Sequence, residues 1–353
     1  SVTVSRALGA GDRPRAARLT TDAHLLAGLA ALVLSAAGLL TMDPLFALLG
    51  AEPEVLPLVR RYMTVWYLGL PLVVVSMASL QVIQAGGDTR TPGLLIVLSV
   101  AANVLLDPLL IFGWGPVPAL GIRGAAIATV LARSSSMLLS LWIVARRERL
   151  FSLAGMSPRA TLGSWGRILH VGVAAAVANI MRPLSMGIIT KLVAAYGVLP
   201  MAGYGVATRV ETFALILIMA VSMVLTPYAG QNAGARKFDR VRQGLRCAWA
   251  FSLSWGVVAL VVFLAFAGPV AGIFNETDEV VGVAGLYLRI MAVSYGFQGL
   301  VVLTTAVFNG LHMPGMAIGV AAVRLFALYV PLAWLGSKLY GMWQELGVLP
   351  ELE

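Results

Sequence analysis

The stretch LTTDAHLLAGLAALVLSAAGLLTM, residues 19–42, is predominantly apolar and ends shortly before an acidic connector. An α-helix of about 20 apolar residues spans the hydrocarbon core of a bilayer. The flanking charges differ in sign: arginines precede the stretch (Arg6, Arg13, Arg15 and Arg18) and acidic residues follow it (Asp43, Glu52 and Glu54). The stretch therefore predicts a helix that crosses a membrane.

Composition extends this prediction to the whole chain of 353 residues, because 59% of them are hydrophobic and only 12% are charged. A soluble domain carries about 25% charged residues. Strands that span a membrane are shorter and alternate in polarity, which these runs do not, and backbone groups in lipid require helical hydrogen bonding. We expect an all-α membrane protein, a polytopic helical bundle with nine spans. The spans lie near 19–42, 55–85, 92–112, 121–145, 167–195, 202–230, 240–268, 278–308 and 314–339.

The net charge of +9 comes from connectors, without a basic helix face or interleaved aromatic residues. This pattern indicates the positive-inside bias of membrane proteins rather than nucleic-acid binding. The basic connectors before the first, fifth and seventh spans fall on one side when the spans are counted alternately. The acidic connectors after the first and seventh fall on the other. We expect an inner (plasma) membrane location with residue 1 in the cytoplasm.

Sequence motifs for covalent chemistry are absent. A single cysteine, Cys247, excludes an intramolecular disulfide and a Cys-rich metal site. The three histidines lack metal-ligand spacing, and no GxGxxG, GxxxxGK[ST] or HExxH motif occurs. We expect no enzyme activity, no metal site, no cofactor and no ATP-driven transport by this chain alone.

An internal repeat with an offset of 225 residues maps Gly9-Ala10 onto Gly234-Ala235 and Tyr62 onto Tyr287. Basic connectors map onto basic ones and acidic onto acidic ones. The two halves, 1–150 and 151–353, should therefore be repeats of parallel orientation, which in transporters enclose the substrate site. When the two halves are aligned at this offset, the first half has no counterpart of the two spans that open the second half. The second half has no counterpart of the last span of the first half. The alignment therefore implies two repeats of six helices each. Residues 1–18 read as a loop.

Several Gly- and Ala-rich motifs resemble, in their order and spacing, those of multidrug and toxic compound extrusion (MATE) transporters. They are RALGAGD (6–12), QAGGDTRTP (84–92), NVLLDP (103–108), LGIRGAAIAT (120–129) and GQNAGA (230–235). The resemblance covers essentially the whole chain and is strongest to the DNA-damage-inducible (DinF-type) branch, with the N- and C-terminal helices missing. It implies two lobes that form a V-shaped cleft and rock to alternate access. It also implies export of organic cations or drugs in exchange for H+ or Na+.

Arg182 is the first candidate site residue, because a charge in the middle of a span is costly and is a functional hypothesis by default. It precedes Pro183, which favours a kink. Arg182 either faces the cleft and pairs with a carboxylate or substrate, or stabilises its lobe through backbone carbonyls. Asn179 lies three residues earlier on the same helix face. The family comparison suggests that Arg182 and Gln298 occupy positions where some Na+-coupled members carry carboxylates, and Gln298 is expected to face the cleft.

Arg209 and Glu211 lie inside the sixth span, where a spacing of two residues directs them to different faces. Glu211 is the only acid well inside the spans of the second half. It could bind the coupling cation or a proton, or it could be an interfacial charge.

Asn103 and Asp107 share a helix face in the third span. Asn103 could ligate a cation or substrate, and Asp107 could carry a proton. Alternatively, both could make interhelical hydrogen bonds beside Pro108.

We expect a monomeric secondary antiporter that exports cationic or amphipathic drugs in exchange for H+ or Na+. Its partners would be small organic cations and the lipid bilayer. One rival is a flippase for a lipid-linked saccharide from the same superfamily, which the cationic Arg182 keeps open. The other is a truncated membrane remnant that does not transport.

Overall fold

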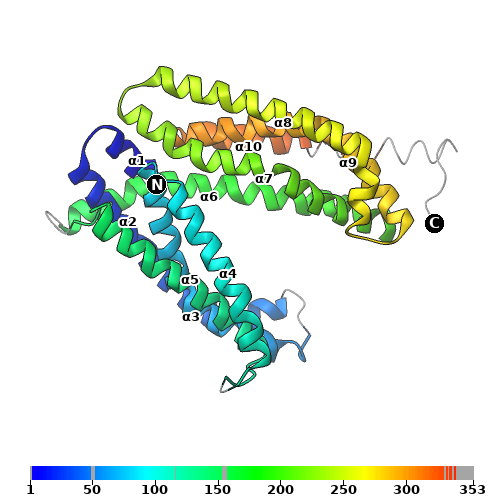
Figure 1. Cartoon of the computed structure of the whole chain (residues 1–353), viewed down its shortest axis with the longest axis horizontal. Coiled ribbons are helices and arrows are strands. Elements are labelled where there is room, and N and C mark those ends of the chain that lie inside the picture. The colour runs from blue at the N-terminus through cyan, green and yellow to red at the C-terminus, as the bar shows by residue number, and fades with distance from the viewer. Residues whose placement is uncertain are drawn as a thin grey trace. The chain divides into compact units, whose positions relative to one another are not determined.

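The computed structural model describes residues 2–48, 52–115, 117–152, 157–329, 331, 332, 334, 335 and 338. Within these ranges, the description excludes the side chains at 171, 174, 175, 178, 179, 181, 182, 185 and 325. The described part is almost wholly helical (Figure 1). Its elements are α1 (Val2–Gly9), α2 (Arg13–Leu48), α3 (Leu56–Ala85), α4 (Arg90–Phe112), α5 (Ile122–Trp142), η1 (Ile143–Arg147), α6 (Pro158–Ala194), α7 (Val198–Gly234), α8 (Phe238–Gly272), α9 (Asp278–Gly310), α10 (Pro314–Ala322) and η2 (Val323–Tyr329).

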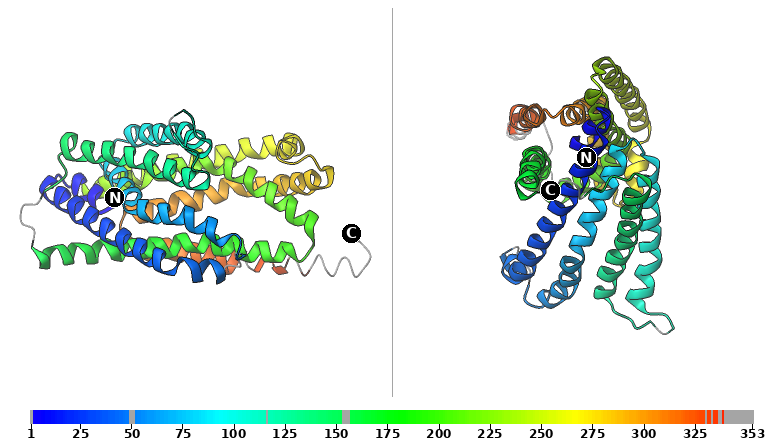
Figure 2. Two further views of the ribbon diagram at one scale, coloured as in Figure 1. Left: turned by 90° about the horizontal axis from the view of Figure 1, so that it is seen from below. Right: turned by 90° about the vertical axis from the view of Figure 1, so that its left-hand side faces the viewer.

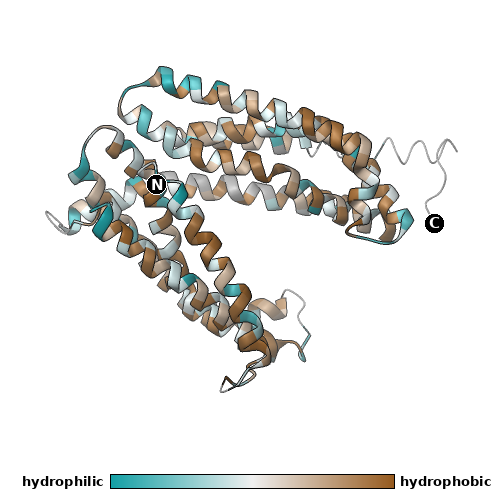
Figure 3. Ribbon diagram, in the orientation of Figure 1, coloured by the Kyte–Doolittle hydropathy of each residue, from teal (hydrophilic) through white to brown (hydrophobic). Residues whose placement is uncertain are grey.

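The predicted spans coincide with helices, which confirms the polytopic all-α fold class. Seven helices of the described part are long and apolar enough to cross a membrane: α2, α3, α4, α5 continued by η1, α7, α8 and α9. The predicted span at 167–195 falls within α6, and the span predicted from 314 begins with α10 and η2. Hydrophobic residues predominate in the middle of the long helices, and many hydrophilic residues lie near the helix ends and connectors (Figure 3).

The expectation of a loop over residues 1–18 is wrong. Residues Val2–Gly9 form helix α1, and α2 begins at Arg13. Two buried apolar side chains of α1 explain the difference, because Val4 and Ala7 lie in the core that α1 shares with α2 and α3, with Leu8 packed against it. A polar, basic composition concealed this short amphipathic pattern.

The 225-residue repeat is visible in the backbone. Helices α1 and α7 end at Gly9 and Gly234, and α3 and α9 end at Ala85 and Gly310. The turns that follow repeat as well. Gly11 (φ 78°) corresponds to Arg236 (φ 58°), and Gly87 (φ 94°) corresponds to His312 (φ 61°). Left-handed backbone is uncommon in residues other than glycine. Its recurrence at one offset, twice, indicates that both halves use the same turn.

The chain forms two compact units. Unit 1 contains residues 1–168 and 234–236, and unit 2 contains residues 169–233 and 237–353. The expected V-shaped cleft depends on the placement of these units and stays a prediction, as does the division into lobes at residue 150.

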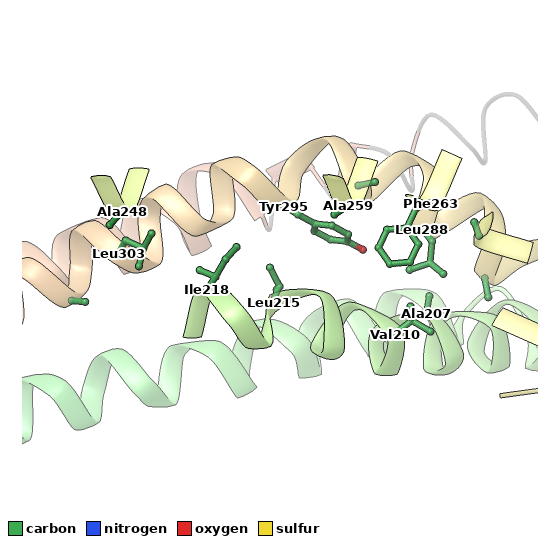
Figure 4. Close-up of a cluster of buried hydrophobic side chains, with 14 of the residues drawn as sticks. Ala207, Val210, Leu215, Ile218, Ala248, Ala259, Phe263, Leu288, Tyr295 and Leu303 are labelled. Carbon is green, nitrogen blue, oxygen red and sulfur yellow. The ribbon is translucent and has the colours of Figure 1, made fainter. Parts of the chain in front are cut away.

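Unit 2 is built on a close approach of α8 and α9, which run side by side (Figure 2). A Cβ atom added at Gly256 would lie 2.5 Å from the Cα of Gly296, so the two glycines let the backbones touch. The hydroxyl of Ser252 donates to the carbonyl of Gly296 at 2.9 Å. Beside this contact, Tyr295 and Phe263 pack edge to face with ring centroids 5.9 Å apart (Figure 4).

Unit 1 uses serine hydroxyls in the same way. Ser136 on α5 donates to the carbonyl of Leu95 on α4 at 3.1 Å, and Ser35 on α2 donates to that of Tyr67 on α3 at 2.7 Å. Such bonds give a small polar side chain a partner inside the bilayer while the helices pack closely.

The connector between α3 and α4 is fixed by Asp88, which lies outside the spans. Its carboxylate accepts from the backbone N–H of Thr91 at 3.0 Å and pairs with the Arg147 guanidinium at 3.0 Å. Burial favours the neutral acid, but the bonds from Thr91 and the charge of Arg147 outweigh it and lower the pKa of Asp88. The start of α4 is thereby tied to the end of η1.

Asp88→Asn should therefore destabilise the protein only where Asp88 is ionised. A lowered pKa in the folded state stabilises the fold above the unfolded pKa, and this contribution is lost as pH falls through the folded pKa. At neutral pH we expect a loss of up to about 1 kcal/mol, which shrinks towards zero as the pH falls below the ordinary aspartate pKa of about 3.9 and through the lowered pKa of folded Asp88. Thermal unfolding of the purified protein at several pH values measures it. Asp239→Asn is the control, since Asp239 is fully exposed and its one ion pair in the described part of the chain is with Arg242. A loss of stability in Asp88→Asn that does not change with pH would contradict a contribution from the ionised carboxylate.

Candidate functional site

Glu211 on α7 lines a cavity of about 380 Å³ in unit 2 and is half-buried. Its Oε2 accepts a hydrogen bond from the hydroxyl of Tyr287 at 3.2 Å, and its Oε1 accepts from Nε2 of Gln298 at 3.4 Å. Both donors come from α9. The structure therefore brings together Glu211 and Gln298, which the sequence singled out separately.

Two further contacts orient these donors. Nε2 of Gln298 also donates to the Ser294 hydroxyl one turn earlier on α9, at 3.0 Å. The ring of Tyr287 meets the ring of Tyr204 edge to face, with centroids 5.7 Å apart. Both tyrosines line the cavity. The carboxylate thus sits among fixed, neutral hydrogen-bond donors and aromatic rings.

The remaining wall of this cavity is largely apolar and adaptable. Met186 from α6, Met219 from α7 and Met291 from α9 all line it, together with Leu215 and Ile218. Methionine side chains are flexible and polarisable and fit apolar ligands of differing shape. The cavity can accept an apolar body beside a single carboxylate.

Arg324 on η2 supplies a second charge to the cavity wall. Its guanidinium carbon lies 4.9 Å from the ring centroid of Tyr329, a cation–π contact. Arg324 and Glu211 form no ion pair, and no other described side chain pairs ionically with Glu211.

Arg209 lies on the exposed side of α7, away from the cavity. The helix turns through about 200° between residues two apart. Arg209 and Glu211 therefore point to different faces, and only Glu211 belongs to the site.

Asn103 and Asp107 form a second polar cluster, in unit 1. Nδ2 of Asn103 donates to Oδ1 of Asp107 at 3.3 Å and to the hydroxyl of Thr129 on α5 at 3.4 Å. Asn103 and Thr129 line a cavity of about 120 Å³, which Arg133 also lines. Both proposed uses of the pair remain open, since it makes an interhelical bond and Asn103 also faces a cavity.

Arg182 and Asn179 belong to α6, which is helical at both positions, but their side chains lie outside the described residues. Their predicted roles stay predictions.

Sequence reasoning missed four residues at these cavities: Tyr204, Tyr287, Arg324 and Arg133. The sequence held a signal for two of them. Tyr204 and Glu211 are seven residues apart and so share a helix face. Arg133 is a charge inside a span, the criterion that selected Arg182. In the sequence, Tyr287 stands out only as the repeat counterpart of Tyr62, and the pairing of α7 with α9 is what places it beside Glu211.

Comparison with known proteins places this geometry in a family. Residues 1–109 and 174–335 match the sequence profile described as MatE. A protein described as an FAD transporter, from Shewanella oneidensis, is 35% identical over 350 residues, covering 99% of this chain and 77% of that protein. A probable multidrug resistance protein NorM from Thermotoga maritima is 24% identical over 355 residues, covering 99% of this chain and 74% of that protein. The crystal structure of the Vibrio cholerae MATE transporter VcmN in the bent form matches with a TM-score of 0.89 and 31% identity, covering 96% of this chain and 76% of that one.

The cavity around Glu211 predicts a difference in thiol reactivity between two neighbouring positions of α7. Thr208 lines the cavity, whereas the side chain of Val210 is buried with 3% exposure. In a Cys247→Ser background, Thr208→Cys should react with N-ethylmaleimide at least several-fold faster than Val210→Cys, because the thiolate must be reachable. Mass spectrometry of labelled protein measures the rates. Equal rates would contradict an accessible cavity.

Proposed function

Because the chain belongs to the MATE family, we propose that it is a secondary active antiporter that exports cationic or amphipathic organic compounds in exchange for H+ or Na+. One observation carries the proposal: Glu211 is a half-buried carboxylate in a methionine- and tyrosine-lined cavity, with uncharged hydrogen-bond donors around it.

The charge of Glu211 calls for a mobile cation. A charged side chain at the bilayer centre costs from about 3 kcal/mol upward. Tyr287 and Gln298 orient the carboxylate but leave its charge in place. A proton, a Na+ ion or a cationic substrate would neutralise it. If the coupling cation and a cationic substrate bind to this carboxylate in turn, each displaces the other. This competition for one carboxylate couples the movement of the cation to that of the substrate.

The wall of the cavity favours an organic cation with an apolar body. The electron-rich faces of Tyr204 and Tyr287 attract cations, and the methionines accommodate varied apolar shapes. This combination of one acid, aromatic rings and adaptable apolar surface suits amphipathic compounds of several kinds.

Glu211→Gln should abolish coupled efflux, since the amide keeps the size of the side chain and can accept from Tyr287 but carries no charge. We expect ethidium efflux driven by a pH or Na+ gradient to fall at least about tenfold in proteoliposomes, the loss expected for about 1.4 kcal/mol or more. Arg209→Gln is the matched control: it also removes a charge from α7, two residues away, and should keep the wild-type rate. Ethidium efflux by Glu211→Gln at the wild-type rate would contradict the proposal.

Export of a flavin nucleotide is a second candidate, favoured by the 35% identity to a protein described as an FAD transporter. FAD carries phosphates and a flat aromatic ring system. Arg324 in the unit 2 cavity could pair with a phosphate while the tyrosines stack on the ring. Glu211 would then bind only the coupling ion.

Proteoliposomes loaded with either FAD or ethidium separate the two candidates. The first predicts gradient-driven ethidium efflux that Arg324→Gln leaves largely intact. The second predicts FAD efflux that Arg324→Gln reduces at least about tenfold, by loss of a charge-assisted contact. Movement of FAD without ethidium would replace the first candidate by the second.

We further propose that the protein lies in the plasma membrane with residue 1 on the cytoplasmic side, an orientation supported by the basic and acidic connectors. That it acts as a monomer stays a prediction. Its assignment to the DinF-type branch rests on the loop motifs. Asn103 and Asp107 are proposed as a second polar binding site for a cation or substrate, in unit 1. The cavity beside Asn103 supports this proposal.

A further inference from the structure

A second kind of cavity lies in unit 1, away from the residues discussed above. It measures about 310 Å³ and is formed by the beginning of α2 and the beginning of α6. Arg15, Arg18 and Arg167 line it, with Ser164 and Gly163 between them. Three arginines thus line one hollow together with Ser164, and most of the exposed lining is contributed by carbon atoms.

Arg18 points to an occupant for this hollow. Its Nη2 nitrogen is buried and has no hydrogen-bond partner in the described part of the chain. An unpaired buried donor on a charged group is costly, by more than the roughly 1–3 kcal/mol of a neutral one. Among the described residues, Arg167 makes one long hydrogen bond, from Nη2 to the hydroxyl of Ser164 at 3.4 Å. The cluster therefore holds guanidinium donors that no acceptor in the described part of the chain satisfies, and an anion that enters the cavity could engage them after a small side-chain shift.

The carboxylates nearest in sequence do not fill this role. Oδ1 of Asp12 accepts from the backbone N–H of Arg15 at 3.0 Å. Oδ1 of Asp22 accepts from the hydroxyl of Thr161 at 3.2 Å, and its Oδ2 has no hydrogen-bond partner in the described part. Neither acid lines the cavity or forms an ion pair with Arg18.

We propose that this cavity binds a phosphate-bearing anion, either the headgroup of an anionic lipid or a soluble phosphate. Guanidinium groups match phosphate oxygens in charge and in bidentate geometry. Basic pockets between membrane helices are known binding places for phosphate headgroups. The volume is at the lower end of the range for ligand pockets, roughly 300–1,000 Å³, which suits a headgroup and is ample for a phosphate ion. Binding would join the start of α2 to the start of α6.

Gly163 allows the charge of the cavity to be changed without crowding it. A Cβ atom added at Gly163 would meet nothing within 4 Å. Gly163→Asp therefore places a carboxylate at the cavity wall, and Gly163→Asn places an amide of the same size there. The pair differs in charge alone.

The test measures thermal unfolding of the purified protein in detergent, with phosphatidylglycerol or phosphatidylcholine added to the micelles. In parallel, sodium phosphate is compared with sodium chloride at equal ionic strength. We expect phosphatidylglycerol, phosphate or both to raise the melting temperature of the wild type and of Gly163→Asn by about 3 °C or more. Gly163→Asp should lose most of that rise.

A rise with phosphatidylglycerol alone would identify a lipid headgroup, and a rise with phosphate alone a soluble phosphate. No rise in the wild type, or the same rise in both Gly163 variants, would overturn the proposal. Should Gly163→Asp fail to fold, Arg167→Gln replaces it, because that side chain is exposed. Arg240→Gln is then the control: it is the repeat counterpart of Arg15 and lies exposed on α8.

Discussion

The lack of water inside a bilayer is the constraint on which this structure depends. Every backbone polar group must be bonded within the chain, so the spans are helices. Irregular backbone lies mostly in the connectors, although Phe266 inside α8 departs from helical geometry (φ −123°, ψ 16°). The same constraint selects the side chains that join helices. The hydroxyls of Ser136 and Ser252 donate hydrogen bonds to backbone carbonyls of neighbouring helices, and Gly256 allows the backbones of α8 and α9 to touch. A carboxylate on a membrane-spanning helix, such as Glu211, is therefore a candidate for a functional role.

Much of the fold could be predicted because helices that cross a lipid bilayer require long apolar runs, which are easily recognised in a sequence. Apolar runs located the long helices, although the observed ends differ from the predicted ones by up to nine residues, as at the start of α6 (Pro158 against 167). The 225-residue offset identified the repeated halves, and the structure extends it to the turns after α3 and α9. That Arg236 and His312 adopt the left-handed conformation of Gly11 and Gly87 could not be predicted, because their residue types argue against it. Helix α1 was missed because its pattern rests on two small apolar side chains, Val4 and Ala7.

The candidate site was predictable in part. Glu211 and Gln298 could be selected singly, one as a charge within a span and the other by family position. Their hydrogen bond depends on how α7 and α9 are paired and rotated, and the same holds for Tyr287. Periodicity within one helix does not determine the register between two helices that are far apart in sequence. The arginines around Gly163 were missed for a related reason. The pattern of charged connectors predicts on which side of the membrane Arg15 and Arg18 lie. It does not predict that Arg167 on α6 lines the same cavity as these two arginines.

A single carboxylate that holds either the coupling cation or the substrate is the central claim of this account. Its most direct test is the count of cations released when substrate binds, because binding of two ligands at one group must be reciprocal. Ethidium added to purified protein in weakly buffered detergent solution should release about one proton or one Na+ per molecule of wild type, and none from Glu211→Gln. Equal release from both proteins would contradict the account.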